Sequence, residues 1–357
     1  MFDLKSHLKT ITEAHGPSGF EGPVREIIRA AWQDFTDTME QDGLGSLIGI
    51  KRATIPINPP RKIMLAAHMD EIGFLVRDIV DGFLYIHDIW GMDSRVLPAQ
   101  PVIVHGKRPL PGLVAAMPPH LTPPDKRKQY LPFDALVVDV GLPASEVAEL
   151  VSIGDVITPD APLLELLGKR VAGKAMDDRA CVAAITVCLH QLQSLQHSWD
   201  VYAVATAQEE TGIYGATTSA YQIQPDIAIA LDVAFADQPG LDEDDACKIG
   251  EGVSVGMGPN FHNKLREKLV EIARYYEIKI QDELAPDPGG TDAASIQVSR
   301  TGVPTLLLGV PTRNMHTPVE TVDLADIERA GRLLAHFISS LDADFMAAID
   351  WDIPKKS

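Results

Sequence analysis

The chain has 357 residues, which is enough for two domains and a large core. Its 50 acidic residues outnumber its 31 Lys and Arg residues, and the net charge of −19 argues against a protein that binds nucleic acid or an anionic membrane through bulk charge. No stretch approaches the roughly 20 apolar residues of a membrane span, so we expect no membrane partner.

The amino-terminal residues and the cysteines bear on the compartment. Residues 1–7, Met-Phe-Asp-Leu-Lys-Ser-His, lack a basic region followed by an apolar run, so we expect no signal peptide and a cytoplasmic location. The spacing of the three cysteines matches no structural zinc motif. Cys181 and Cys188 fall in an apolar helical pattern, and we expect both to be reduced core residues.

The first part of the chain predicts amphipathic helices and then a buried strand. Residues 3–40 have helical apolar spacing, and residues 61–68, Arg-Lys-Ile-Met-Leu-Ala-Ala-His, have the composition of a strand. This strand ends at His68, and Asp70 follows two residues later. In an extended segment both point to the same side, so Asp70 can orient a metal-binding His68. The alternative for this pair alone is a polar loop.

Composition changes after Gly73. Residues 97–132 contain nine of the 26 prolines, and the short apolar runs around them have no long helical pattern between them. Proline in sheets is confined to bulges, strand starts and edges. We therefore expect a small β-rich domain, PDZ-like or barrel-like, over residues 74–167. It would be inserted in a discontinuous α/β domain, residues 1–73 and 168–357, with a mixed sheet flanked by helices.

The larger domain resumes near Gly173, where Asp177 and Asp178 precede a helix predicted over residues 179–195. Carboxylates at a helix start interact favourably with the helix dipole, so capping is the alternative to metal binding at this position. The next apolar strand begins at residue 201 and leads to two adjacent acids, Glu209 and Glu210. Neighbouring carboxylates repel each other unless a positive charge lies beside them. The alternative for this pair is a solvated loop.

Further strands and helices complete the domain. Residues 225–232 form an apolar strand that ends at Asp232, and residues 304–309 form a last buried strand that leads to His316. The remaining predicted elements are helices over residues 263–276, 293–300 and 324–341 and a strand over residues 278–281.

His, Asp or Glu thus follows a strand or begins a helix in five segments: His68/Asp70, Asp177, Glu209/Glu210, Asp232 and His316. Sites in open α/β sheets form at the carboxyl ends of the strands, so these side chains should meet. Two histidines with three or four carboxylates suit zinc, cobalt or manganese. This number of carboxylates is high for one zinc ion and natural for two ions that share a bridge.

Six motifs, in this order, make the chain resemble the tetrahedral aminopeptidases, also called glutamyl or deblocking aminopeptidases, which are dinuclear-metal exopeptidases. They are His68-Met-Asp-Glu-Ile-Gly-Phe, Lys174-Ala-Met-Asp-Asp-Arg, Gln208-Glu-Glu-Thr-Gly-Ile-Tyr-Gly-Ala, Ala230-Leu-Asp-Val, Gly289-Gly-Thr-Asp-Ala and Val310-Pro-Thr-Arg-Asn-Met-His-Thr-Pro-Val-Glu. The resemblance spans most of the chain. It implies an enzyme that releases N-terminal residues from short peptides by means of a metal-activated water.

The resemblance also implies a role for each site residue. Asp177 would bridge two metal ions, His68 and Asp232 would complete one metal site, Glu210 and His316 would complete the other, Glu209 would be the general base and acid, and Asp70 would orient His68. Zinc is the first choice of metal, and cobalt and manganese are alternatives.

Assembly and specificity depend on less constant parts of the family pattern. The resemblance implies a homo-oligomer, a dodecamer built from dimers, in which His120 of the insert would be structural or a subunit contact rather than a ligand. Family members often have Gly-Lys-Gly-Pro where this chain has Gly-Met257-Gly-Pro, and they often have Val-Gly-Leu-Arg-Gly-Ala where this chain has Thr211-Gly-Ile-Tyr-Gly-Ala. The preferred N-terminal residue therefore does not follow from the resemblance.

Other activities use similar ligands. A two-metal deacylase of N-acyl amino acids, a dipeptidase and a carboxypeptidase are the enzyme alternatives. A glycosidase would need two free carboxylates rather than a metal cluster. A catalytically inactive scaffold is the alternative that is not an enzyme, but every predicted ligand and Glu209 are present.

Overall fold

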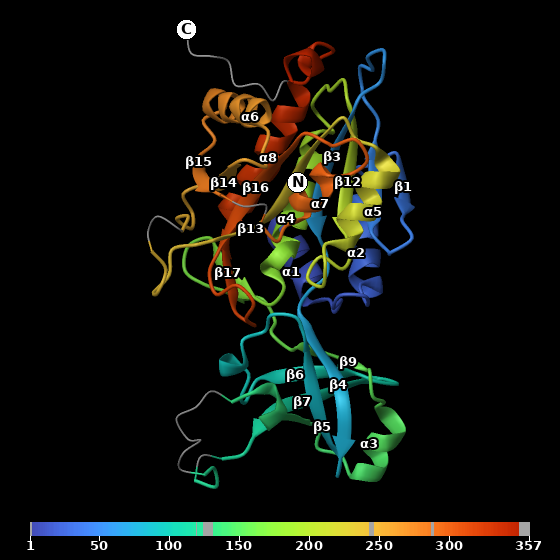
Figure 1. Ribbon diagram of the computed structural model, residues 1–357, viewed down its shortest axis with the longest axis vertical. Coiled ribbons are helices and arrows are strands. Elements are labelled where there is room, and N and C mark those ends of the chain that lie inside the picture. Colours follow the sequence, from blue (N-terminus) through green and yellow to red (C-terminus); the bar gives the residue numbers. More distant parts are fainter. Residues whose placement is uncertain (1, 119, 124–130, 243–245, 287–288, 350–357) are drawn as a thin grey trace.

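The computed structural model describes residues 2–118, 120–123, 131–242, 246–286 and 289–349. A larger α/β domain and a smaller β domain stand end to end (Figure 1). The smaller domain forms the lower part of that view, and the larger domain contains both ends of the described chain.

One mixed sheet of eight strands is the centre of the larger domain. In spatial order, the strands are β1 (Thr38–Gln41), β2 (Leu47–Lys51), β12 (Asp200–Thr206), β3 (Lys62–His68), β13 (Ile227–Phe235), β16 (Thr305–Thr312), β14 (Val253–Met257) and β15 (Ile280–Leu284). The four central strands, from β12 to β16, are parallel. Because both faces of these strands are covered, they are continuous apolar runs rather than alternating ones. Their parallel pairing brings their carboxyl ends to one edge of the sheet.

Helices cover both faces of this sheet: α1 (Leu4–Glu13), α2 (Gly22–Trp32), α4 (Met176–Gln191), α5 (Tyr214–Ile223), α6 (Asn263–Tyr275), α7 (Asp292–Gln297) and α8 (Leu324–Ser339). The first three, with α6 and α8, form one layer, while α5 and α7 pack together against the other face. A Cβ atom at Gly331 of α8 would lie 2.5 Å from Val187 Cβ of α4, so glycine permits the close packing of these two helices.

The smaller domain is a closed antiparallel barrel of six strands. In spatial order, they are β4 (Gly73–Val80), β5 (Phe83–Ile89), β8 (Leu136–Asp139), β7 (Pro109–Ala116), β6 (Pro101–His105) and β9 (Val156–Pro159), with α3 (Ala144–Leu150) and the 3-10 turns Ser94–Val96 and Phe133–Ala135 between strands. Closure leaves no free strand edge. The inserted β-rich domain is therefore confirmed, in its barrel-like form. The exact domain boundaries at residues 74 and 167 stay a prediction.

A small three-stranded sheet connects two segments that carry site residues. It consists of β10 (Leu164–Glu165), β11 (Arg170–Gly173) and β17 (Glu320–Asp323). Gly173 pairs with Glu320, so the chain leading to Asp177 lies beside the chain that follows His316. A 3-10 turn at Phe345–Ala348 is the last described element.

Several predicted boundaries were wrong. Residues 38–40, expected to be helical, belong to β1, because α2 ends at Trp32 and the chain then pairs with β2. Asp232 lies inside β13 rather than at its end, because pairing with β16 continues to Phe235. The strand expected at residues 278–281 begins and ends later, as β15.

The cysteines and the apolar segments agree with a compact interior. Cys181, Cys188 and Cys247 are all free and buried, which confirms the prediction for the first two. Within the described ranges, no helix is both long and apolar enough to cross a bilayer.

Candidate active site

The sheet brings six of the seven predicted site residues to one cleft. His68 ends β3 and pairs with Thr206 at the end of β12, after which the chain turns to Glu209 and Glu210. Asp232 belongs to β13, the other neighbour of β3. Asp177 reaches the cleft from the start of α4, and His316 reaches it from the loop after β16. The cleft has a volume of about 460 Å³.

Asp177 lies at the centre of this group. Its Oδ1 is 3.0 Å from His68 Nε2, and its Oδ2 is 3.4 Å from His316 Nε2. The same His316 nitrogen lies 3.5 Å from Glu210 Oε2. Asp177 and Asp178 have non-helical backbone angles within the segment assigned to α4. Each oxygen of the Asp177 carboxylate thus faces a different histidine.

Asp70 lies behind the cleft and is completely buried. Its Oδ1 accepts a hydrogen bond from the backbone N–H of Glu209 at 3.1 Å, and its Oδ2 accepts one from that of Glu210 at 3.2 Å. Ser18 Oγ donates to Oδ2 at 2.5 Å. The His68 Nδ1 atom lies 3.5 Å from Oδ1. One carboxylate therefore positions the histidine and also the turn that presents both glutamates.

The sequence analysis did not identify Glu320 as a site residue. Its Oε2 accepts the backbone N–H of Asp177 at 3.1 Å, and its Oε1 accepts that of His316 at 2.8 Å. It thus holds together two candidate ligands that are 139 positions apart in the printed sequence. Its place at the end of the Met-His-Thr-Pro-Val-Glu motif was the only indication of this role.

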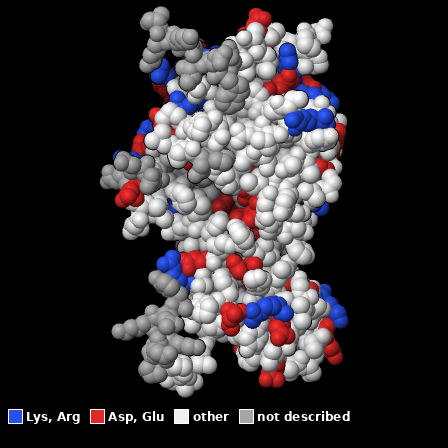
Figure 2. Space-filling view, in the orientation of Figure 1, with Lys and Arg blue, Asp and Glu red and all other residues white. Residues whose placement is uncertain are grey.

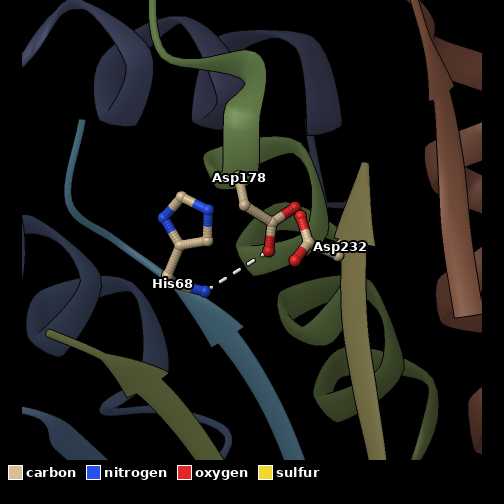
Figure 3. Close-up of side chains that lie close together, drawn as sticks. All are labelled: His68, Asp178 and Asp232. Carbon is tan, nitrogen blue, oxygen red and sulfur yellow. Dashed lines mark hydrogen bonds between the residues drawn. The ribbon is translucent and has the colours of Figure 1, made fainter. Parts of the chain in front are cut away.

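Asp178 is the second residue that sequence reasoning missed. Its Oδ2 accepts the backbone N–H of His68 at 3.3 Å, and its carboxylate lies beside that of Asp232 (Figure 3). His68, Asp178 and Asp232 are close enough to share an ion, as are His68, Asp177 and Glu210. The sequence did not indicate this role, because Asp178 was interpreted only as part of a helix start.

Glu71, Lys174 and Arg179 form a buried ionic group next to the segments that carry His68 and Asp177. Glu71 Oε2 lies 2.6 Å from Lys174 Nζ, and Glu71 Oε1 lies 3.2 Å from Arg179 Nη2. Removing one partner from such a group leaves an uncompensated buried charge and strongly destabilises a protein. These contacts join the strand-end segment after His68 to the segment around Asp177.

Burial dominates the protonation of the acids. It raises the pKa of Glu209 to about 9 and also raises the pKa values of Glu210 and Asp232. Burial alone would also raise the pKa of Asp177, but hydrogen bonds to His316 and His68 lower it. Burial would lower the pKa of His68, yet its hydrogen bonds to Asp177 and Asp70 raise it. The protein thus holds several carboxylates where their charged forms need cations.

The donor atoms fit metal ions. Glu210 Oε1 and Asp178 Oδ1 are buried and have no hydrogen-bond partner within the described part of the chain. A buried carboxylate oxygen without a donor is costly unless it meets a cation. Figure 2 shows acidic side chains gathered in a hollow near the middle of one face, above the barrel. Histidine and carboxylate donors in this arrangement suit divalent transition metals.

Comparisons with known proteins identify the family of the chain. The sequence profile of the M42 glutamyl aminopeptidase family matches residues 45–333. Lysyl aminopeptidase of Pyrococcus furiosus is 35% identical over 340 residues, which cover 94% of this chain and 96% of that protein. A TET aminopeptidase from a marine sediment archaeon of the Thaumarchaeota has a TM-score of 0.90 and 34% identity, covering 97% of this chain and 99% of that one.

A further solved relative, PhTET1-12s, is a dodecamer in its crystal asymmetric unit. It has a TM-score of 0.83 and 31% identity, covering 96% of this chain and 100% of that one. The family profile spans most of the chain, and the relatives match it almost from end to end. The chain therefore belongs to the M42 glutamyl aminopeptidase family of metallopeptidases, which hydrolyse peptide bonds to release N-terminal residues.

Proposed function

We propose that the cleft holds two divalent ions that share one carboxylate. The bridging residue is Asp177; His68 and Asp232 complete one site, and Glu210 and His316 complete the other. The observation that carries this assignment is that the two oxygens of Asp177 face different histidines. Two such ions would offset the charges of four buried carboxylates. Zinc is the preferred metal because it readily takes histidine and carboxylate ligands, with cobalt and manganese as alternatives.

Glu209 is the proposed general base and acid. When bound, divalent ions lower the pKa of a water molecule and polarise the peptide carbonyl. Glu209 Oε2 lies 3.8 Å from His68 Nε2, and the residue lines the cleft. Its carboxylate takes a proton from the attacking water and returns it to the leaving amine. Asp70 fixes the backbone of Glu209, so the carboxylate stays at the site of proton transfer.

We also propose that the chain assembles into a dodecamer built from dimers, through contacts that involve the barrel. The described barrel segment exposes several large apolar side chains: Trp90, Leu113, Met117 and Leu121. Exposed apolar groups on a compact domain are typical of interaction surfaces. PhTET1-12s provides the assembly size. Light scattering that shows only a monomer at micromolar concentration would contradict this assembly.

The test of the proposed activity is the order of cleavage of an unfolded decapeptide. Mass spectrometry should show stepwise losses from the N-terminus, because exopeptidase selectivity requires a free α-amine. The same peptide with an acetylated N-terminus should be cleaved far more slowly. Early internal fragments, or equal rates on the two peptides, would instead favour an endopeptidase or a deacylase.

A further inference from the structure

We propose that Glu283 selects peptides with a basic N-terminal residue, lysine or arginine, by binding the side-chain cation of that residue in the cleft. This inference rests on the proposed two-metal function of the same cleft. It adds the substrate class, which neither the motifs nor the family description provides.

The charged side chains that line the cleft are all acidic, apart from its histidines. Its described lining contains five carboxylates and no Lys or Arg. Four of these carboxylates, those of Asp177, Glu209, Glu210 and Asp232, belong to the proposed metal centre. Glu283 is the acid that remains. The cleft therefore offers a charge partner to a basic substrate side chain and none to an acidic one.

The sheet places Glu283 at a suitable distance from the metal ligands. Its Oε2 accepts a hydrogen bond from Ser254 Oγ of β14 at 2.5 Å. Ser254 and Asp232 both pair with Gly309 of β16, so their strands are two spacings, or roughly 10 Å, apart. An extended lysine side chain has five bonds of about 1.5 Å between Cα and Nζ and reaches roughly 6 Å. The remaining gap is roughly 4 Å, which is the upper limit of the N···O distance in an ion pair.

The path between the metal ligands and Glu283 is lined by small residues. A Cβ atom at Gly309 would lie 3.1 Å from Glu283 Oε2 and 2.9 Å from Ala234 Cβ. Gly309 thus lets Ser254, Ala234 and Glu283 pack closely over the sheet, because a Cβ atom there would lie only 2.1 Å from Ser254 Oγ. A second cavity of about 240 Å³ shares Ala234, Phe235 and Glu283 with the cleft. A long side chain can extend over Ala234 towards this second space.

Glu283 has no cationic partner within the described ranges. Burial raises its pKa, and the hydrogen bond from Ser254 opposes that rise. A bound ammonium or guanidinium group would favour the ionised form. Its neighbour Asp282 differs, because Asp282 is exposed and forms an ion pair with Arg266. Asp282 also lines the second cavity, so the control for Glu283 is taken from outside it.

The experiment compares lysyl and norleucyl p-nitroanilides, whose side chains have similar lengths but differ in charge. For the native enzyme loaded with zinc, cobalt or manganese, kcat/KM for the lysyl substrate should exceed that for the norleucyl one by about tenfold or more. Glu283→Gln should reduce this ratio by a similar factor, mainly through KM. The control Glu251→Gln removes the same charge at an exposed residue outside both cavities and should change the ratio less than about twofold.

Each outcome has a distinct meaning. If the native enzyme cleaves norleucyl or glutamyl substrates with the same kcat/KM as lysyl ones, the role of Glu283 is wrong. The aminopeptidase proposal would then still stand. An equal loss of lysyl and norleucyl cleavage in Glu283→Gln, with the metal content retained, would also overturn it. A loaded enzyme that cleaves none of these substrates would instead contradict the proposed function.

Discussion

The two domains treat buried polar groups in opposite ways. Among the described residues from Gly73 to Pro159, Thr158 is the only buried polar residue, and the barrel interior is apolar. The larger domain buries a network of acids, histidines and cations around the ends of its parallel strands. A buried charge is expensive unless it is paired or binds metal. The barrel is therefore organised for packing, whereas the sheet edge is organised for chemistry.

The largest expected effect is at Glu209. Glu209→Gln keeps the size of the side chain and removes its basicity, so kcat should fall by about 10²–10⁴-fold while both metals stay bound. Steady-state kinetics and elemental analysis of the same preparation provide the measurement. Near-native turnover in this variant would show that another group moves the proton.

A cavity in the barrel should act on stability rather than on chemistry. Leu84 is completely buried in the barrel core. Leu84→Ala should lower the free energy of unfolding by about 2–5 kcal/mol, and kcat per folded enzyme should stay near that of the native chain. Denaturant unfolding and active-site titration test this. A large loss of kcat in fully folded protein would contradict the division between the two domains.

Glu320 tests whether the buried network positions the ligands. Glu320→Gln replaces one accepting oxygen by an amide NH₂ group, which cannot accept from the N–H of Asp177 or His316. We expect metal affinity to fall by about 10–100-fold, as for other groups that orient ligands. Competition with a chelating dye measures this affinity. The surface variant Glu251→Gln, whose partner is the exposed Lys279, should bind metal normally.

A last expected effect is on the pH dependence of the chelated protein. Burial raises the pKa of Glu209 from an ordinary 4.5 to about 9, so between these values the folded protein binds more protons than the unfolded chain. Stability without metal should therefore decrease as pH rises through this window. Glu210 and Asp232 shift the same way. The unfolding temperature after chelation should fall between about pH 6 and pH 8, whereas metal-loaded protein should change less. A rise would contradict this sign.

The main architecture could be predicted because the patterns that indicate it lie within short stretches of the sequence. Continuous apolar runs predicted the buried strands, and short apolar runs among many prolines predicted the β-rich insert. The predicted ends of helices and strands were wrong where pairing with a strand distant in the sequence determined them. Asp232 was expected at a strand end, but pairing with β16 extends β13 to Phe235. Thr38–Gln41 became a strand because β2 was available beside it.

The candidate ligands could be predicted as a group, but their supports could not. Each ligand follows an apolar strand or begins a helix, which is visible in the sequence. Glu320 acts through the backbone N–H groups of two distant segments, and no spacing rule indicates such contacts. Glu283 lies on an edge strand whose cleft-facing orientation depends on the register with β14. The direct roles of the metal ligands stay a prediction until metal content is measured.

Asp70 holds the turn of Glu209 and Glu210, and Glu320 holds the segments of Asp177 and His316 together, in each case by hydrogen bonds from backbone N–H groups. The fold itself therefore holds the side chains proposed as metal ligands in place. We therefore expect that metal binding requires no ordering of a loop and loses little conformational entropy. The association rate would then be set by the loss of water from the arriving ion. Metals would exchange in and out of a folded protein, and the ion in the enzyme would follow the supply of metals in its surroundings.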